Sequence, residues 1–184
     1  MRVKEILVLA ADLCGRRDLA EYLAGKNGAD AGAYAREAES LLRCYNLAEN
    51  EIALDYLPVR RTQMFESEGC IPYADFAAQP VEILSVRDAA GKKLSFTAGE
   101  KGVRVRAGQA LVEYSVRPRV KGEGDIPELA ARGDGRLLAL GTACEFALMS
   151  GNTDAASLLD KRYRDALACA CRERGGRLKL RRWA

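Results

Sequence analysis

Two amphipathic stretches in the C-terminal half of the chain constrain its fold most. The first runs from about Ile126 to Ser150, with a weak region at residues 132–135, and the second from about Thr153 to Arg174. In both, apolar residues recur every three or four positions, the spacing that gives a helix one apolar face. These positions are Leu137, Leu138, Gly141, Cys144, Ala147 and Leu148 in the first stretch, and Ala155, Leu158, Leu159, Tyr163, Ala166, Leu167 and Ala170 in the second.

The residues between these stretches favour a tight turn. Gly151 can adopt the left-handed conformation that ends a helix, and Asn152 or Thr153 can cap the next helix. We therefore expect an antiparallel helical hairpin whose two apolar faces pack together. Asp125, with Glu128 three positions later, resembles a capping box and predicts the start of the first helix.

The N-terminal 58 residues predict further helices. A short helix should end near Gly15, and a second piece should run from Asp18 to Leu23. A longer helix follows, in which apolar residues recur on one face over about five turns. These residues are Tyr34, Ala38, Leu41, Leu42, Tyr45, Ala48 and Ile52. Pro58 cannot continue a helix, so we expect it to end near Leu57.

Between residues 59 and 118 the apolar period becomes strand-like. Residues 109–117 alternate between apolar and polar side chains, as expected for a strand with one buried face. Shorter alternating runs occupy residues 81–87, 93–97 and 103–106, and glycine-containing turn sequences separate them. Residues 62–66 and 71–76 suggest one or two more strands. The segment therefore predicts an antiparallel β unit of about five or six strands.

These elements together predict an α+β fold. The 184 residues suffice for a helical domain that carries a small insertion. We expect residues 1–58 and 119–174 to form one bundle of about four to five helices. Residues 59–118 would form the inserted antiparallel β unit, and residues 175–184 a separate C-terminal tail.

The residue inventory argues against catalysis and against bound cofactors. General acid–base chemistry at neutral pH most often uses histidine, and the chain has none. The six cysteines lack the spacing of a zinc site, so we expect structural thiols, no metal and a reducing compartment. No apolar run approaches the length of a membrane span, and Glu5 and Asp12 make the N-terminus unlike a secretion signal. We expect a protein that is not an enzyme.

The C-terminal tail alternates basic and apolar residues. A net charge of +3 does not by itself imply nucleic-acid binding, so the local clustering matters more. The tail could dock on an acidic protein surface, contact a phosphate backbone, or have no specific role. The leucines and the tryptophan favour docking on protein, because a purely electrostatic arm does not need them. The candidate docking residues are Arg177, Leu178, Lys179, Leu180, Arg181, Arg182 and Trp183.

The order of these features resembles a known family over about the whole chain. The helical start includes residues 39–46 (ESLLRCYN) and 50–58 (NEIALDYLP), and the β segment ends in residues 112–118 (VEYSVRP). Residues 125–127 (DIP), 141–151 (GTACEFALMSG) and 155–163 (AASLLDKRY) follow. This arrangement is similar to the head-to-tail connector, or adaptor, proteins of tailed bacteriophages and prophages, including the tail-tubular type.

The resemblance implies a structural role in the neck of the virion, with synthesis in the cytoplasm of a bacterial host. Such proteins form homo-oligomeric rings, usually of about twelve copies, in which helical bundles pack side by side. The ring docks between the portal protein and the tail or stopper protein, and DNA passes through its lumen. The C-terminal segment commonly reaches the portal, and residues 177–183 match that role here. The alternative is a nucleic-acid-binding packaging accessory or regulator that uses the basic tail.

Overall fold

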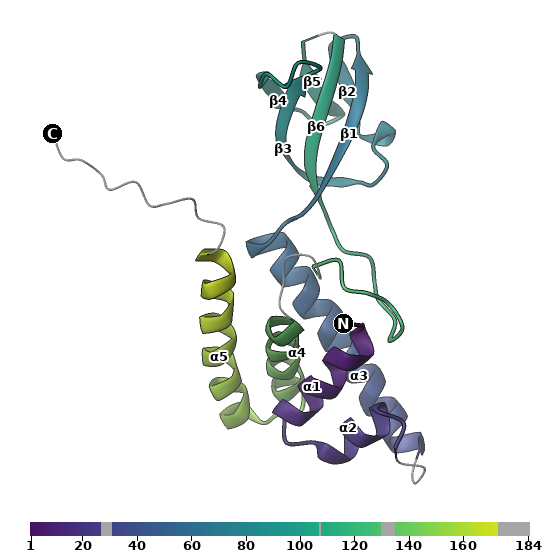
Figure 1. The fold of residues 1–184 in the computed structure, drawn as a ribbon, viewed down its shortest axis with the longest axis vertical. Coiled ribbons are helices and arrows are strands. Elements are labelled where there is room, and N and C mark those ends of the chain that lie inside the picture. Colours follow the sequence, from purple (N-terminus) through teal and green to yellow (C-terminus); the bar gives the residue numbers. More distant parts are fainter. Residues whose placement is uncertain (27–30, 107, 130–134, 173–184) are drawn as a thin grey trace, which may run out of the picture. The chain divides into compact units, whose positions relative to one another are not determined.

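The computed structural model of the chain describes residues 1–26, 31–106, 108–129 and 135–172 (Figure 1). These residues form five α-helices and six β-strands, and the antiparallel strands lie between the N-terminal and C-terminal helices in the sequence. The fold is therefore α+β, as the sequence predicts. The chain divides into a helical unit, Met1–Ile52 with Arg119–Ala184, and a β unit, Ala53–Pro118.

The N-terminal helices follow the predicted periodicity. They are α1 (Val3–Leu13), α2 (Arg17–Leu23) and α3 (Ala31–Glu51). After α1 the chain turns at Gly15, whose φ of +73° is easily reached only by glycine. A π-helical turn, Ile52–Tyr56, extends α3 before Pro58 stops the helical path.

The predicted hairpin is formed by α4 (Gly135–Met149) and α5 (Thr153–Arg172). Gly151 has a φ of +74°, and its N–H donates to the carbonyl of Leu148 at 3.0 Å. The N–H of Asn152 donates to the carbonyl of Ala147 at 2.9 Å, which completes a glycine C-cap. The Asn152 Oδ1 atom then accepts from the N–H of Ala155 at 3.2 Å and so caps α5, as predicted.

The central helix of the helical unit is α4. It contacts α1, α3 and α5, and every residue from Leu137 to Cys144 is buried. The prediction of a single apolar stripe on α4 is therefore wrong, because the helix is enclosed rather than packed on one side. Gly141 fits this position, since a Cβ atom there would lie 3.1 Å from the ring of Tyr163 and 3.2 Å from the Cβ of Ala48.

The outer helix α5 buries a narrower face than the sequence suggests. Its fully buried apolar residues are Ala156, Leu159, Tyr163 and Leu167. Leu158 belongs to the predicted stripe but is 64% exposed, because it lies on the opposite side of the helix. Leu148 at the end of α4 was also expected to be buried, and it is 53% exposed.

The predicted helix start at Ile126 is wrong. Residues 126–129 are non-helical, and the described part of α4 begins at Gly135. The carboxylates expected to form a capping box stabilise a loop instead: Asp125 Oδ2 accepts from Gly122 N at 2.8 Å, and Glu128 Oε1 accepts from Arg119 N at 3.1 Å. Each carboxylate thus satisfies a loop amide rather than a helix N-terminus.

The β unit contains two three-stranded antiparallel sheets. One has the order β1 (Val59–Ser67), β6 (Gly108–Val116), β3 (Pro80–Asp88). The other has the order β2 (Cys70–Pro72), β5 (Gly102–Val105), β4 (Phe96–Ala98). A 3₁₀ turn, Tyr73–Asp75, occupies the middle of the segment predicted as a strand at residues 71–76, and β2 covers only its first two residues.

The two sheets are built from consecutive ladders along the chain, β1–β6 and then β2–β5. The β1–β6 ladder runs from Val59 opposite Val116 to Ser67 opposite Gly108, and the β2–β5 ladder resumes with Cys70 opposite Arg104. The register shifts by one residue between the ladders, which is the signature of a β-bulge. Gly69 and Gly108 flank the shift and have φ values of +120° and +121°. A residue with a side chain would be strained in this backbone conformation.

The strands of the two sheets share a small apolar core. Phe76 is at its centre, with its ring centroid 4.7 Å from that of Phe65 and 4.9 Å from that of Tyr114 in an edge-on arrangement. Valines of the strands surround the rings, and Val86, Val103 and Val112 have no exposed surface. The β unit therefore has an independent apolar core.

Candidate assembly surfaces

The predicted docking tail lies outside the described residues. Helix α5 is described up to Arg172, and Arg177, Leu178, Lys179, Leu180, Arg181, Arg182 and Trp183 all follow it. Their role stays a prediction from the sequence. The surfaces that the structure does describe belong to the helical unit and to the β unit, considered separately.

Large apolar side chains are exposed on three helices of the helical unit. Leu47 on α3 is 60% exposed, and Leu158 on α5 is 64% exposed. Leu148 and Met149, at the end of α4, are also more than half exposed. Single exposed leucines are common on soluble proteins, and these four side chains are candidate contact positions for another protein.

A groove of about 360 Å³ lies between α3, α4 and α5. We call it the α3–α4–α5 groove, and its lining combines apolar and acidic side chains. The carboxyl-bearing residues are Glu51, Glu145 and Asp160, whereas Arg164 is the basic residue that lines it. The Asp160 carboxylate accepts from Arg164 Nε at 3.0 Å. The sequence pairs Asp160 with neighbouring basic residues but gives no sign that α3 and α4 add two more carboxylates.

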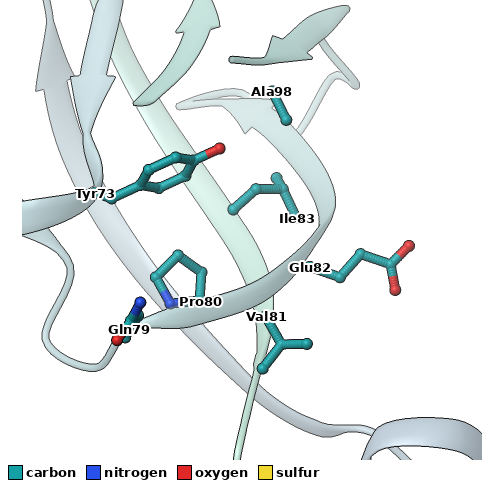
Figure 2. Close-up of a pocket in the computed structure, with 7 residues that line it drawn as sticks. All are labelled: Tyr73, Gln79, Pro80, Val81, Glu82, Ile83 and Ala98. Atoms are coloured by element: carbon teal, nitrogen blue, oxygen red, sulfur yellow. The ribbon is translucent and has the colours of Figure 1, made fainter. Parts of the chain in front are cut away.

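The β unit has a separate hollow of about 530 Å³. It is lined by the start of β3, by Tyr73 and by Ala98. Figure 2 shows the Tyr73 ring beside the Ile83 side chain, whereas Glu82 points away from both. The Tyr73 hydroxyl donates to the carbonyl of Gly99 at 2.9 Å, so it is engaged in holding the β4–β5 turn. Glu82 is the single ionisable carboxylate among these lining residues, which gives the hollow little catalytic potential.

A buried polar cluster fixes the loop before α4 onto α3. Asn46 accepts from the N–H of Lys121 at 2.7 Å, and its side-chain amide donates to the Lys121 carbonyl at 3.1 Å. The buried Lys121 ammonium pairs with Glu128 Oε1 at 2.8 Å. The Glu49 Oε1 atom accepts from the N–H of Glu128 at 2.8 Å.

The carboxylate of Glu49 lies in an unfavourable environment for charge. Glu49 is 1% exposed, and burial raises its pKa above the ordinary value, against the smaller opposing effects of the Glu128 amide and Lys121. Burial and the nearby Glu49 carboxylate also raise the pKa of Tyr45 far above its usual range. Among the described residues, neither Glu49 Oε2 nor the Tyr45 hydroxyl makes a hydrogen bond of acceptable geometry. These buried contacts hold the loop before α4 against α3, which is a structural role rather than a catalytic one.

The six cysteines are free thiols that occupy different environments. Burial raises the pKa of Cys14 and of Cys44 to about 11, and it raises the pKa of Cys144 as well. The Cys14 thiol donates to the carbonyl of Ala143 at 3.4 Å. These three thiols therefore stay protonated and unreactive at neutral pH. Cys70 and Cys169 are exposed, and Cys171 is half-buried.

Two structural findings concern metal binding and membrane insertion. Across residues 1–26, 31–106, 108–129 and 135–172, no cluster of three or more histidine, cysteine or acidic residues is arranged to hold a metal ion. None of the helices in that part of the chain is both long and apolar enough to span a membrane.

The chain matches no protein-family model, and no curated protein is significantly similar to it.

Proposed function

We propose that this protein is a virion structural protein that forms a ring at the head-to-tail junction of a tailed bacteriophage or prophage. In this role it acts as an adaptor between the portal and the tail or stopper protein, and DNA passes through the lumen of the ring. The resemblance of residues 39–163 to such adaptors motivates the proposal. The observation that carries it is the exposure of large apolar side chains on α3, α4 and α5 of the helical unit.

The exposed side chains lie where packing of helical bundles would use them. Leu47 on α3 and Leu158 on α5 leave most of their surface in water, although each helix buries other apolar residues. Full burial of an exposed leucine side chain contributes about 1.5–3 kcal/mol to the free energy of association. Contact between copies through these helices would therefore be favourable. A ring places two different surfaces of each subunit against its neighbours, and apolar residues on more than one helix suit that geometry.

Co-assembly with the portal protein tests this proposal most directly. The purified chain is mixed with the portal protein encoded beside it, and the mass of the product is measured by size-exclusion chromatography with light scattering. We expect a complex containing about twelve copies of the chain. Self-association of the chain alone is a weaker check, because some adaptors remain monomeric until they meet the portal. A purified pair that never associates would contradict the proposal.

The alternative function is nucleic-acid binding by the basic tail. Six arginines and lysines lie within the last thirteen residues: Arg172, Arg174, Arg177, Lys179, Arg181 and Arg182. This alternative requires strongly salt-dependent binding to duplex DNA, which deletion of residues 175–184 should abolish. If the full-length chain does not bind duplex DNA at low salt, nucleic-acid binding is excluded as its function. Weak contact with DNA in the lumen of a ring would remain consistent with the first proposal.

A further inference from the structure

The α3–α4–α5 groove combines an apolar interior with an acidic margin. Gly141 has no side chain and Ala156 has a small one, and Leu148 beside them is 53% exposed. Three carboxylates, those of Glu51, Glu145 and Asp160, line the groove beside one guanidinium, that of Arg164, which pairs with Asp160 at 2.9 Å. A ligand that suits it must therefore offer apolar side chains to cover Leu148 and positive charge to meet the carboxylates.

The last residues of the chain have this chemistry. Residues 177–181 alternate arginine or lysine with leucine, and Trp183 follows. In an extended segment, alternate side chains point to opposite sides, so the leucines share one side and the basic residues the other. Long basic side chains can bend toward nearby carboxylates while the leucines face the groove.

The position of this segment in the chain also fits. It follows α5, which forms one wall of the groove. Arg172 lies twelve residues after Asp160, which corresponds to about 18 Å along a helix. The twelve residues after Arg172 span up to about 40 Å when extended, so they can return to the groove, and Gly175 and Gly176 permit the reversal.

We infer that residues 177–183 of the same chain dock in the α3–α4–α5 groove of the free subunit. A tether this short gives the segment an effective concentration in the millimolar range at its own groove, so it outcompetes the tails of other copies in dilute solution. The docked tail covers Leu148 and brings positive charge to a groove in which three carboxylates face one guanidinium. Any partner that binds the tail must first displace it from the groove. This inference concerns the isolated subunit and does not depend on the proposed role in a virion.

Trp183 supplies the measurement, because it is the single tryptophan of the chain. Acrylamide quenching of its fluorescence is measured on the full-length protein at low salt. We expect quenching that is reduced relative to the same protein in denaturant, because docking of Leu178 and Leu180 holds the nearby Trp183 close to the helical unit, and that stays unchanged over a hundredfold dilution. High salt should increase the quenching, because it screens the attraction between the tail and the carboxylates.

Charge reversal locates the binding surface. The double variant Glu145→Lys/Asp160→Lys should lose the shielding of Trp183 completely. The control Asp165→Lys makes one such charge reversal at an exposed position of α5 outside the groove and should retain the shielding, and each single groove variant, Glu145→Lys or Asp160→Lys, should reduce it more than this control does. A tail variant, Arg177→Glu/Lys179→Glu/Arg181→Glu, alters no described residue and should also lose the shielding. Combining the groove and tail reversals should restore it.

Three results would overturn the inference. Trp183 could be as accessible in the native protein as in denaturant, or equally shielded in the tail-reversal variant and the parent. Shielding that disappears on dilution would show that the tail of another copy occupies the groove. Helical circular dichroism of each variant separates loss of docking from loss of folding.

Discussion

Glu49 shows how one buried residue can set the pH dependence of the helical unit. Its pKa is raised by burial in the folded protein above the ordinary glutamate value of 4.5. The folded state therefore holds a proton that the unfolded state releases, and the free energy of unfolding should fall as the pH rises from about 4.5 to the folded pKa. Below about pH 4.5 this contribution is fully present, because both states are protonated.

The variant Glu49→Gln should remove this pH dependence. Glutamine keeps a side-chain oxygen for the N–H of Glu128 but has no proton to lose, so the variant should be more stable than the parent at neutral pH. Glu49→Ala is the contrasting variant: it leaves the Glu128 amide without its acceptor and should cost about 1–3 kcal/mol. Urea denaturation between pH 4 and pH 8 measures both effects. A Glu49→Gln variant with the same pH profile as the parent would contradict the argument.

Thiol reactivity should separate the cysteines by environment. Cys70 and Cys169 are exposed and should react rapidly with a thiol reagent such as DTNB near pH 8. Cys14 and Cys44 have pKa values raised to about 11 by burial and should react only on unfolding. Cys70→Ser and Cys169→Ser should each remove one fast equivalent. Rapid labelling of Cys44 in the native protein would contradict this assignment.

At the scale of single elements, Gly102 determines whether β2 can pair with β5. A Cβ atom at this position would lie 2.3 Å from the backbone oxygen of Ile71, which is too close for either strand to accept without moving. Gly102→Ala should therefore destabilise the β unit by about 1–3 kcal/mol, the usual cost of overpacking. Urea titration followed by near-ultraviolet circular dichroism of the aromatic cluster measures the change.

Gly99→Ala is the matched control at the other end of the same turn. A Cβ atom there would lie 3.5 Å from the carbonyl oxygen of Gly102, an ordinary contact. The control should change the stability much less than Gly102→Ala does. Equal losses from both substitutions would show that the turn, rather than the approach of β2 to β5, limits the stability.

The elements that local patterns encode could be predicted from the sequence, and those that depend on packing could not. Alternation predicted β6, and Gly151 with Asn152 predicted the turn between α4 and α5. The spacing of apolar residues on α4 did not reveal that this helix is enclosed by three others. The Asp125–Glu128 pair had the spacing of a capping box, but tertiary contacts with a loop used both carboxylates.

The α3–α4–α5 groove was invisible in the sequence for the same reason. Its carboxylates come from three helices, and Glu51 and Asp160 are more than a hundred residues apart in the chain. The candidate docking tail was the opposite case, because its alternation is local and could be recognised without a fold. Sequence patterns thus identified the candidate docking segment by its composition, whereas the surface proposed to bind it required the arrangement of the helices.

At the scale of the whole molecule, the proposed ring predicts which exposed leucines matter. Leu47 and Leu158 are more than half exposed and line neither described hollow, so their replacement should leave the fold and the groove intact. Leu47→Ser/Leu158→Ser should change the free energy of unfolding of the isolated subunit by no more than about 0.5 kcal/mol per site. Val81→Ser, at an exposed position of β3 in the β unit, is the matched control.

The same substitutions should strongly weaken assembly. Each leucine buried between copies contributes about 1.5–3 kcal/mol, so its loss should raise the dissociation constant by about tenfold to a hundredfold per interface. Light scattering of mixtures with the portal protein, titrated over subunit concentration, measures this shift. Val81→Ser should assemble like the parent if the contacts are made by the helical unit. If the leucine variant and the parent assembled equally well, the contacts between copies would have to lie elsewhere, and the exposed helical surface would no longer support the adaptor role.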